Sequence, residues 1–270
     1  MRIAVLGATG RMGAAVIRLI AGSGDLALSG AAAEAGHPGL GQDAGAAAGV
    51  GVLGVHVTAS VTAAVAGAEV AIDFSNAAAV GSNLDACLAE RCALVMGTTG
   101  LSPLHLGLIE QASRRIPIVY GRNMSVGVAV LTELARMATQ LLGSEADIEI
   151  VEAHHRNKVD APSGTALQLG EAVAGVLGRR IEDVTARDRF VQRAPRSPGS
   201  IGFSSVRAGQ IVGDHEVLFA LEEETLRLEH RALDRSTFAR GALRAARWVA
   251  GRTPGLYGMT DVLGLARPQA

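Results

Sequence analysis

The first 22 residues constrain the fold of this chain more than any other segment. The run RIAVL at 2–6 is short and apolar, the turn GATGRMG follows at 7–13, and AAVIRLIAG then carries apolar residues at helical spacing. A buried strand that enters a helix through a glycine turn begins a βαβ unit. The N-terminus therefore predicts a parallel sheet, and its apolar run is too short for a secretion signal.

The same alternation of strands and helices continues to about residue 124. Further strands are expected at 26–34, 68–75, 93–100 and 116–121, and helices at 61–67, after Asn76 and at 104–115. Residues 35–56 are rich in Gly and Ala without a period and are predicted to be loop. Apolar strands that alternate with helices indicate a parallel sheet covered on both faces. We predict a Rossmann-like dinucleotide-binding domain over 1–124.

The pattern changes after this point. An amphipathic helix at 128–142 precedes a strand with one wet face at 146–153, and a loop then leads into another helix. A polar surface loop is expected at 187–200, followed by three strands between 201 and 233 that are joined by turns. These elements predict a second, α+β domain over 125–235 with a mixed or mostly antiparallel sheet. A helix at 236–250 follows, and 236–270 is expected to return to the first domain.

Composition excludes several classes of function. Hydrophobic residues make up 49% and charged residues 19% of the 270 residues, as in a globular protein, and the net charge of −1 comes with no basic block. We therefore expect no nucleic-acid and no membrane partner. Cys87 and Cys92 match neither a zinc nor a redox motif, so two reduced thiols in a cytoplasmic protein are expected.

Glycine spacing after the first strand favours a dinucleotide ligand. Gly7, Gly10 and Gly13 lie three apart, and the helix that follows would offer free N–H groups to phosphates. A turn that merely lets helix pack on strand is the alternative. Glu34, at the end of the second expected strand, can accept hydrogen bonds from the ribose hydroxyls of NADH and repel the phosphate of NADPH. It could also be a solvated loop residue.

Two later segments end strands of the same sheet. GTTG at 97–100 follows one strand, and Asn123 follows the next, where it could reach the nicotinamide ribose. Ligands of such sheets lie at the carboxyl ends of the strands. An ordinary strand-to-helix turn is the alternative for GTTG.

The segment EAHHRNKVDAPSGTA, at 152–166, carries the candidate chemistry. Lys158 is the only lysine in the chain, whereas the other basic residues are arginine. Lysine and histidine can donate a proton, but arginine stays charged, which gives a reason for one lysine to persist other than chance. His154 and His155 would point to opposite sides of an extended segment, so only one of them is expected to face Lys158.

The end of this segment predicts an anion site at the start of a helix. Ser163 or Thr165 can cap the helix, and its N–H groups could bind a substrate carboxylate, although a plain cap is the alternative. Asp160 either orients the lysine or shapes the turn. No metal is expected, because the two histidines and Asp160 match no known ligand spacing. A purely structural role for the histidines remains open.

These motifs resemble those of the 4-hydroxy-tetrahydrodipicolinate reductase family, also called dihydrodipicolinate reductase. GATGRMG, GTTG and above all EAHHRNKVDAPSGTA carry the resemblance, which extends to 201–220 and to DVLGL at 261–265. It implies a Rossmann-like domain and a second domain whose sheet builds a homotetramer. It also implies reduction of a cyclic dicarboxylate by NADH or NADPH, with loss of water, on the diaminopimelate route to lysine.

The resemblance also implies roles for individual residues. His154 would be the general acid/base and Lys158 the proton donor, while His155, Gly164 and Thr165 would bind the substrate. The cofactor would be bound by Gly7, Ala8, Thr9, Gly10, Arg11, Met12, Glu34, Gly97, Thr98, Thr99, Gly121, Arg122, Asn123 and Met124.

Two positions depart from the family pattern. Ala35 stands where some members carry an arginine for the NADPH phosphate, and Arg122 replaces a residue that is usually small or proline. Since Arg122 could restore phosphate affinity or hold the substrate, the sequence leans only mildly to NADH. Two other functions are compatible with the residues alone. One is an NAD-dependent dehydrogenase of another amino or imino dicarboxylate, and the other is a non-catalytic NADH sensor, for which Lys158 would be dispensable.

Overall fold

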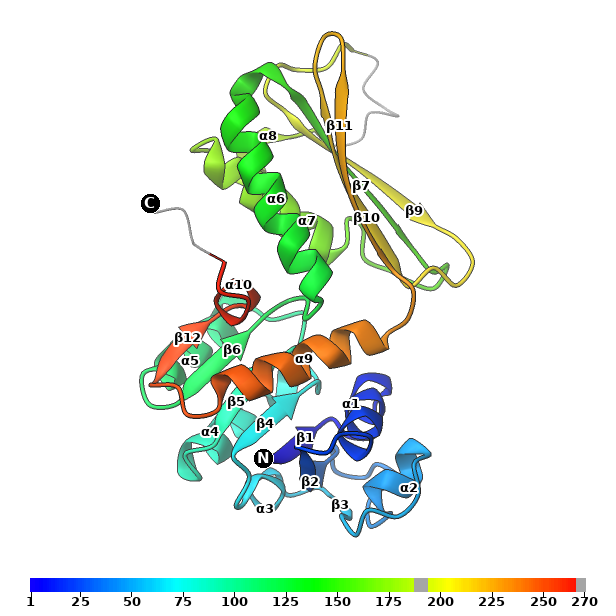
Figure 1. Cartoon of the computed structure of the whole chain (residues 1–270), viewed down its shortest axis with the longest axis vertical. Coiled ribbons are helices and arrows are strands. Elements are labelled where there is room, and N and C mark those ends of the chain that lie inside the picture. The colour runs from blue at the N-terminus through cyan, green and yellow to red at the C-terminus, as the bar shows by residue number, and fades with distance from the viewer. Residues whose placement is uncertain (187–193, 266–270) are drawn as a thin grey trace. The chain divides into compact units, whose positions relative to one another are not determined.

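A computed structural model describes residues 1–186 and 194–265 of the chain (Figure 1). The chain divides into two units that are described separately. Unit 1 comprises residues 1–126 and the segment from Arg235 onward, and unit 2 comprises Gly127–Asp234. Within the described ranges, no helix combines the length and the apolar composition that crossing a membrane requires.

Unit 1 is built on a parallel sheet. Its described strands lie in the order β12-β6-β5-β4-β1-β2-β3, and each pairs in parallel with its neighbours. Their bounds are β1 (Arg2–Leu6), β2 (Ala27–Ala32), β3 (Val57–Thr58), β4 (Val70–Asp73), β5 (Ala93–Met96), β6 (Pro117–Tyr120) and β12 (Gly255–Tyr257). The chain order reverses between β1 and β4, which is the place where ligands bind in sheets of this topology.

Helices cover both faces of this sheet (Figure 1), as the sequence predicts. They are α1 (Arg11–Ala21), α2 (Ala44–Ala48), α3 (Val61–Val65), the 3-10 turn η1 (Ala77–Ala79), α4 (Val80–Ala89), α5 (Pro103–Ser113), α9 (Ser236–Val249) and α10 (Met259–Val262). Helix α9 packs against α1 and against β4, β5 and β6. On the other face, residues of α3, α4 and α5 form one apolar core with alternate residues of the strands.

Several expectations for unit 1 were wrong in detail. Strand β2 ends at Ala32, so Glu34 lies exposed two residues beyond the strand instead of at its end. The segment 35–56 is not all loop, because it contains α2. Its N-cap Asp43 accepts hydrogen bonds from the N–H groups of Gly45 and Ala46, a cap that replaces the missing apolar period. The short elements β12 and α10 were also not expected.

Unit 2 is built on a mixed sheet. Its described strands lie in the order β11-β10-β7-β9-β8, with β10 antiparallel to β7 and β11, and with β9 parallel to β7 and β8. Their bounds are β7 (Asp147–His154), β8 (Thr185–Ala186), β9 (Ile201–Arg207), β10 (Gly213–Ala220) and β11 (Thr225–Ala232). The helical elements are α6 (Val126–Leu142), the 3-10 turn η2 (Gly143–Glu145), α7 (Gly164–Val176) and α8 (Ile181–Val184). Residues of α6 and α7 form a core with one face of the sheet.

The register of β7 determines where its polar residues point. The sequence suggests that the strands now seen as β9 and β10 are joined by a turn and adjacent, but β7 lies between them. Glu152 of β7 is paired with His215 of β10, and His154 with Arg207 of β9. Because side chains alternate along a strand, Glu152 and His154 share the helix-covered face with Ile150. Of the loop expected at 187–200, residues 187–193 lie outside the described residues.

Candidate active site

The carboxyl ends of β1, β4, β5 and β6 bring four loops to one edge of the sheet in unit 1. These loops begin at Gly7, Phe74, Gly97 and Gly121, and the strands that precede them are neighbours. Three of the four loops contain residues that the sequence assigns to the cofactor. The topology thus gathers distant segments at the edge where a dinucleotide binds.

A groove of about 420 Å³ lies along this edge. Among the predicted cofactor residues, Gly7, Thr9, Gly10 and Glu34 line it. Phe74, Ser75 and Asn76, which follow β4 and which the sequence analysis did not assign to the cofactor, line it as well. The predicted residues that do not line this groove are Ala8, Arg11, Met12, Gly97, Thr98, Thr99, Gly121, Arg122, Asn123 and Met124.

The glycine turn is a tight backbone cradle in which a side chain at Gly7 or Gly13 would collide with other backbone atoms. Gly7 has φ +76°, and a Cβ atom there would lie 2.7 Å from the carbonyl oxygen of Phe74. A Cβ atom at Gly13 would overlap the carbonyl oxygen of Gly7. Gly10, the N-cap of α1, has no side chain to cap the helix, so the first N–H groups of α1 are offered to a ligand. This cradle and the helix N-terminus fit a pyrophosphate.

Asp73 at the end of β4 holds two of these loops together. Its side chain is buried and accepts hydrogen bonds from the Ser75 N–H at 2.8 Å, from Asn83 Nδ2 at 3.0 Å and from Thr98 Oγ1 at 3.2 Å. Through Thr98, the predicted GTTG turn is connected to the loop after β4. Nothing in the sequence pattern distinguishes Asp73 from an ordinary residue at the end of a strand.

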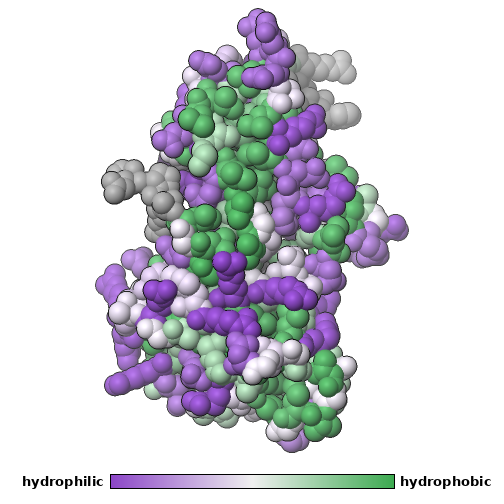
Figure 2. Space-filling view, in the orientation of Figure 1, coloured by the Kyte–Doolittle hydropathy of each residue, from purple (hydrophilic) through white to green (hydrophobic). Residues whose placement is uncertain are grey.

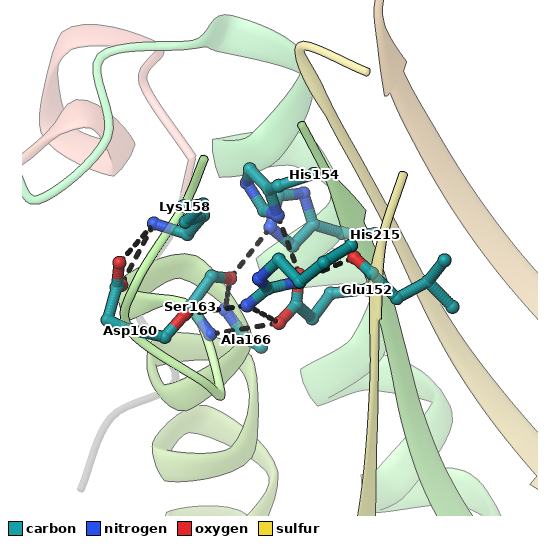
Figure 3. A network of polar contacts seen from close by, with 9 residues as sticks. Glu152, His154, Lys158, Asp160, Ser163, Ala166 and His215 are labelled. Carbon is teal, nitrogen blue, oxygen red and sulfur yellow. Dashed lines mark hydrogen bonds and ion pairs between the residues drawn. The ribbon is translucent and has the colours of Figure 1, made fainter. Parts of the chain in front are cut away.

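In unit 2, the predicted acid His154 is held by a buried carboxylate (Figure 3). His154 Nδ1 lies 2.6 Å from Glu152 Oε2, and only 1% of the Glu152 side chain is exposed. Arg207 of β9 donates to both carboxylate oxygens of Glu152, at 2.8 and 2.7 Å. Burial alone would raise the pKa of Glu152, but the hydrogen bonds from His154, Arg207 and Ser205 outweigh it and hold the pKa well below its usual range.

The start of α7 belongs to the same network. The Ser163 N–H donates to Glu152 Oε1 at 3.2 Å, and Ser163 Oγ caps α7 by accepting from the Ala166 N–H at 3.1 Å. The same hydroxyl lies 3.1 Å from Nε2 of the buried His215. Burial, with the nearby charge of His154, lowers the pKa of His215 to about 3, so this ring is neutral. Gly164 and Thr165, the predicted carboxylate-binding residues, form the first turn of the helix fixed in this way.

The predicted proton donor Lys158 forms a second, more exposed pair. Its Nζ lies 2.8 and 2.9 Å from the two carboxylate oxygens of Asp160, whose side chain is 60% exposed. Burial would raise the pKa of Asp160, but the hydrogen bond from Lys158 lowers it overall. The backbone N–H of Lys158 donates to the carbonyl of His155, which closes the turn after β7. The carbonyl of Asp160 accepts from Arg207, which connects this pair to Glu152.

All five residues that the sequence assigns to catalysis and substrate binding belong to unit 2, and its hydrogen bonds connect His154, Lys158 and the start of α7. The arrangement supplies two candidate proton donors, each paired with a carboxylate, in the same unit as a helix N-terminus that suits an anion. Sequence analysis did not single out Glu152, Arg207 or His215. A signal existed for Glu152, since it lies two residues before His154 and so on the same face of one strand. The described residues contain no group of three His, Cys, Asp or Glu side chains placed to hold a metal ion.

Comparison with protein families gives matches over both units. Residues 1–124 match the model described as dihydrodipicolinate reductase, N-terminus, and residues 127–263 match dihydrodipicolinate reductase, C-terminus. A protein named 4-hydroxy-tetrahydrodipicolinate reductase from Anaeromyxobacter sp. (strain Fw109-5) is 49% identical over 265 residues, which cover 98% of each chain. Its namesake from Thiobacillus denitrificans is also 49% identical over 265 residues, covering 98% of this chain and 99% of the relative.

Solved structures share the fold. The dipicolinate-bound dihydrodipicolinate reductase from Paenisporosarcina sp. TG-14 superimposes with a TM-score of 0.74 at 21% identity, covering 97% of this chain and 98% of that one. An amine dehydrogenase from Mycobacterium smegmatis gives a TM-score of 0.61 at 13% identity, covering 100% and 97%. At these identities the likeness concerns the fold alone.

Proposed function

The chain belongs to the dihydrodipicolinate reductase family, and from this premise we propose how its two units share the reaction. It is an NAD(P)H-dependent oxidoreductase that reduces 4-hydroxy-tetrahydrodipicolinate to tetrahydrodipicolinate in the diaminopimelate route to lysine. One hydride and one proton enter the substrate and one water leaves. The observation that carries this function is that the family match covers both the cofactor groove of unit 1 and the His154–Lys158 segment of unit 2.

We propose that unit 1 is the dinucleotide-binding domain and that unit 2 is the substrate-binding domain. The glycine cradle would hold the pyrophosphate against the start of α1, and Glu34 would accept hydrogen bonds from the ribose of the adenosine half. The loops that begin at Gly97 and Gly121 would hold the nicotinamide half. When bound, the reduced cofactor supplies the hydride.

In unit 2, we propose that the substrate carboxylates bind at the start of α7, where Gly164 and Thr165 form the first turn. The helix dipole and its N–H groups favour an anion there. His155 would contribute to the same binding surface. His154 would act as general acid/base, and Lys158 would donate the proton that accompanies the hydride.

A test of the function is oxidation of NADH and of NADPH by the purified protein, with substrate made in place from pyruvate and aspartate semialdehyde by the preceding synthase. We expect turnover with both cofactors and a higher kcat/KM with NADH, because the exposed carboxylate of Glu34 lines the groove and Ala35 offers no positive charge. Glu34→Gln should lower the KM for NADPH and raise that for NADH. No turnover with either cofactor would refute the function, and an unchanged cofactor ratio in the variant would refute the role of Glu34.

Lys158→Arg tests the proton donor separately. Arginine keeps the positive charge and can still pair with Asp160, but it cannot release a proton under assay conditions. We expect kcat to fall by about 100-fold or more, within the usual range for a lost general acid, while NADH binding is retained. Arg156→Lys, the reverse exchange at an exposed position of the same turn, is the control and should leave kcat unchanged. Turnover that survives Lys158→Arg would make Lys158 a charge clamp instead of a donor.

We further propose that unit 2 forms a homotetramer and that the enzyme works in the cytoplasm. One face of the mixed sheet is covered by α6 and α7, which leaves the opposite face available to other copies. Figure 2 shows hydrophobic surface along α6, where Val130, Leu134, Met137 and Leu141 are exposed. Sedimentation velocity would give a single species of four chains, and a monomer at micromolar concentration would contradict the proposal.

A further inference from the structure

The most deeply buried carboxylate near the proposed acids is Glu152, which no sequence motif assigned. It lies on β7 with 1% of its side chain exposed, on the face that α6 and α7 cover. Burial of an ionised carboxylate is strongly unfavourable unless its oxygens are fully hydrogen-bonded. Such a group persists in a core only where its partners offset this cost.

Besides the Ser205 side chain, two donors contact each oxygen of Glu152. Oε2 accepts from Arg207 at 2.8 Å and lies 2.6 Å from His154 Nδ1, while Oε1 accepts from Arg207 at 2.7 Å and from the Ser163 N–H at 3.2 Å. The bidentate pair with Arg207 neutralises the charge and fixes the plane of the carboxylate. The other two donors belong to the proposed acid and to the residue before the proposed substrate-binding turn.

The contact with His154 determines which ring nitrogen is presented for chemistry. An ionised carboxylate only accepts hydrogen bonds, so Nδ1 must carry a proton and Nε2 is the nitrogen that exchanges one. Nε2 lies beside Gly213, where a Cβ atom would be 3.1 Å away. The missing side chain at the start of β10 therefore keeps space open at the reactive nitrogen.

The contact with Ser163 fixes the start of α7. Ser163 receives three restraints, namely its own N–H to Glu152, its hydroxyl to the Ala166 N–H, and its hydroxyl to His215 Nε2. Arg207 also donates to the carbonyl of Asp160, three residues earlier. The ion pair of Glu152 and Arg207 thereby contacts the segment that carries Lys158 at two places, at Asp160 and at Ser163, just before Gly164.

We propose that Glu152 is the positioning residue of this site. Its carboxylate holds the His154 ring with Nδ1 protonated, so that Nε2 is the nitrogen that exchanges a proton. It also fixes the position of the first turn of α7 relative to that ring. This inference rests on the proposed function for its effect on turnover. The rival role is a purely structural ion pair in which Glu152 and Arg207 join β7 to β9. That role predicts a loss of stability but no specific change in the protonation of His154.

The first test is the protonation of His154 in the full-length protein labelled with ¹⁵N-histidine. His154→Gln identifies the ring signals by their disappearance. Under conditions in which the ring holds a single proton, we expect that proton on Nδ1 in the unaltered protein and mainly on Nε2 in Glu152→Gln. A proton that resides on Nε2 in the unaltered protein would overturn the inference, whether or not the protein turns over substrate.

The second test is the kinetics of Glu152→Gln, with Glu216→Gln as the matched control. Glu216 lies on the adjacent strand β10, points to the opposite face of the sheet and is paired with Arg227 at 3.2 Å. We expect kcat of Glu152→Gln to fall by about 100-fold, as for a misdirected general acid, with the KM for NADH unchanged. The control should keep its kcat. A folded Glu152→Gln variant with the kcat of the unaltered protein would overturn the inference.

A failure of folding, or of the proposed function, can be distinguished from a failure of this inference. If Glu152→Gln does not fold, Glu152→Asp retains the charge and shortens the reach by one methylene, and an unchanged kcat in that folded variant would count against positioning. If the unaltered protein reduces no substrate, the proposed function fails, but the nitrogen signals of His154 still decide the geometry.

Discussion

Replacement of the buried His215 by glutamine should change how the stability of unit 2 depends on pH. Glutamine can place a polar atom where His215 Nε2 meets Ser163, but it cannot take up a proton. Burial lowers the pKa of His215 to about 3 in the folded state, with His154, His230 and Lys158 acting in the same direction and Glu152 opposing them. The ordinary value for histidine is 6.5.

The sign follows from the direction of this shift. Between pH 6.5 and pH 3 the unfolded chain binds a proton at His215 that the folded chain does not, so the folded state loses stability as the pH falls through this window. The slope approaches about 1.4 kcal/mol per pH unit for one proton. Integrated from pH 8 to pH 5, the contribution of His215 is a loss of about 2 kcal/mol.

The window above pH 5 also separates His215 from its neighbour Glu152. The lowered pKa of Glu152 contributes stability that begins to be lost only as the pH falls toward about 4, where an unfolded glutamate takes up a proton. The other histidines are common to both proteins and cancel in the difference. The variant should therefore lose about 2 kcal/mol less than the unaltered protein between pH 8 and pH 5.

The assay must report on unit 2. Trp248 is the only tryptophan and lies in α9 of unit 1, so its fluorescence does not report on His215. Native-state hydrogen exchange of the backbone amides of β7 and β10, corrected for intrinsic rates, measures the opening free energy of the relevant strands. Parallel loss of stability in the two proteins would refute the reasoning, because it would mean that His215 takes up a proton in the folded state at an ordinary pH.

Two glycine positions give further predictions. Gly213→Ala should place a methyl group 3.1 Å from His154 Nε2 and lower kcat by about 10-fold, part of what a general acid contributes, with the midpoint of thermal unfolding unchanged. An unchanged kcat would show that Nε2 does not need that space. Gly241→Ala should overlap the carbonyl of Met124, where α9 touches the chain after β6, and destabilise unit 1 by about 1–3 kcal/mol in urea unfolding followed by Trp248 fluorescence. Unfolding at the original urea concentration would contradict this close packing.

The fold of unit 1 could be predicted because its signals are local. The apolar run before Gly7, the turn itself and the helical spacing after it lie within 22 consecutive residues, and such signals repeat along the unit. The same reasoning failed for α2, since five residues of Ala and Gly have no apolar period. That helix depends on the carboxylate of Asp43, which also accepts hydrogen bonds from Leu53 and Gly54, ten and eleven residues away.

Only part of the candidate site in unit 2 could be predicted, because only some of its signals are local in the sequence. His154, Lys158 and Thr165 lie on one continuous segment whose residue types indicate proton transfer and anion binding. Arg207 lies 55 residues from Glu152 in the sequence, and it reaches that carboxylate only because β9 runs parallel to β7. Strand order is a property of the whole sheet, and the turn-rich segment after 200 suggested a different order. His215 likewise lies at a position of an alternating strand that faces the core. Its role cannot be predicted until its partner Ser163, from a distant segment, is known.

Glu152 and Asp160, the carboxylate partners of His154 and Lys158, differ in exposure. This difference gives a reason why one lysine persists among arginines. Glu152 is 1% exposed and surrounded by donors, so its bond to His154 is short and fixed. Asp160 is 60% exposed, and water can replace it as a partner of Lys158 at little cost. A group held by an exposed partner can turn to a ligand that arrives, whereas a group held by a buried partner keeps one direction. In the proposed roles, His154 would be a fixed acid and Lys158 a movable one. Lysine suits the second role because its flexible ammonium group, unlike a guanidinium, can lose its proton.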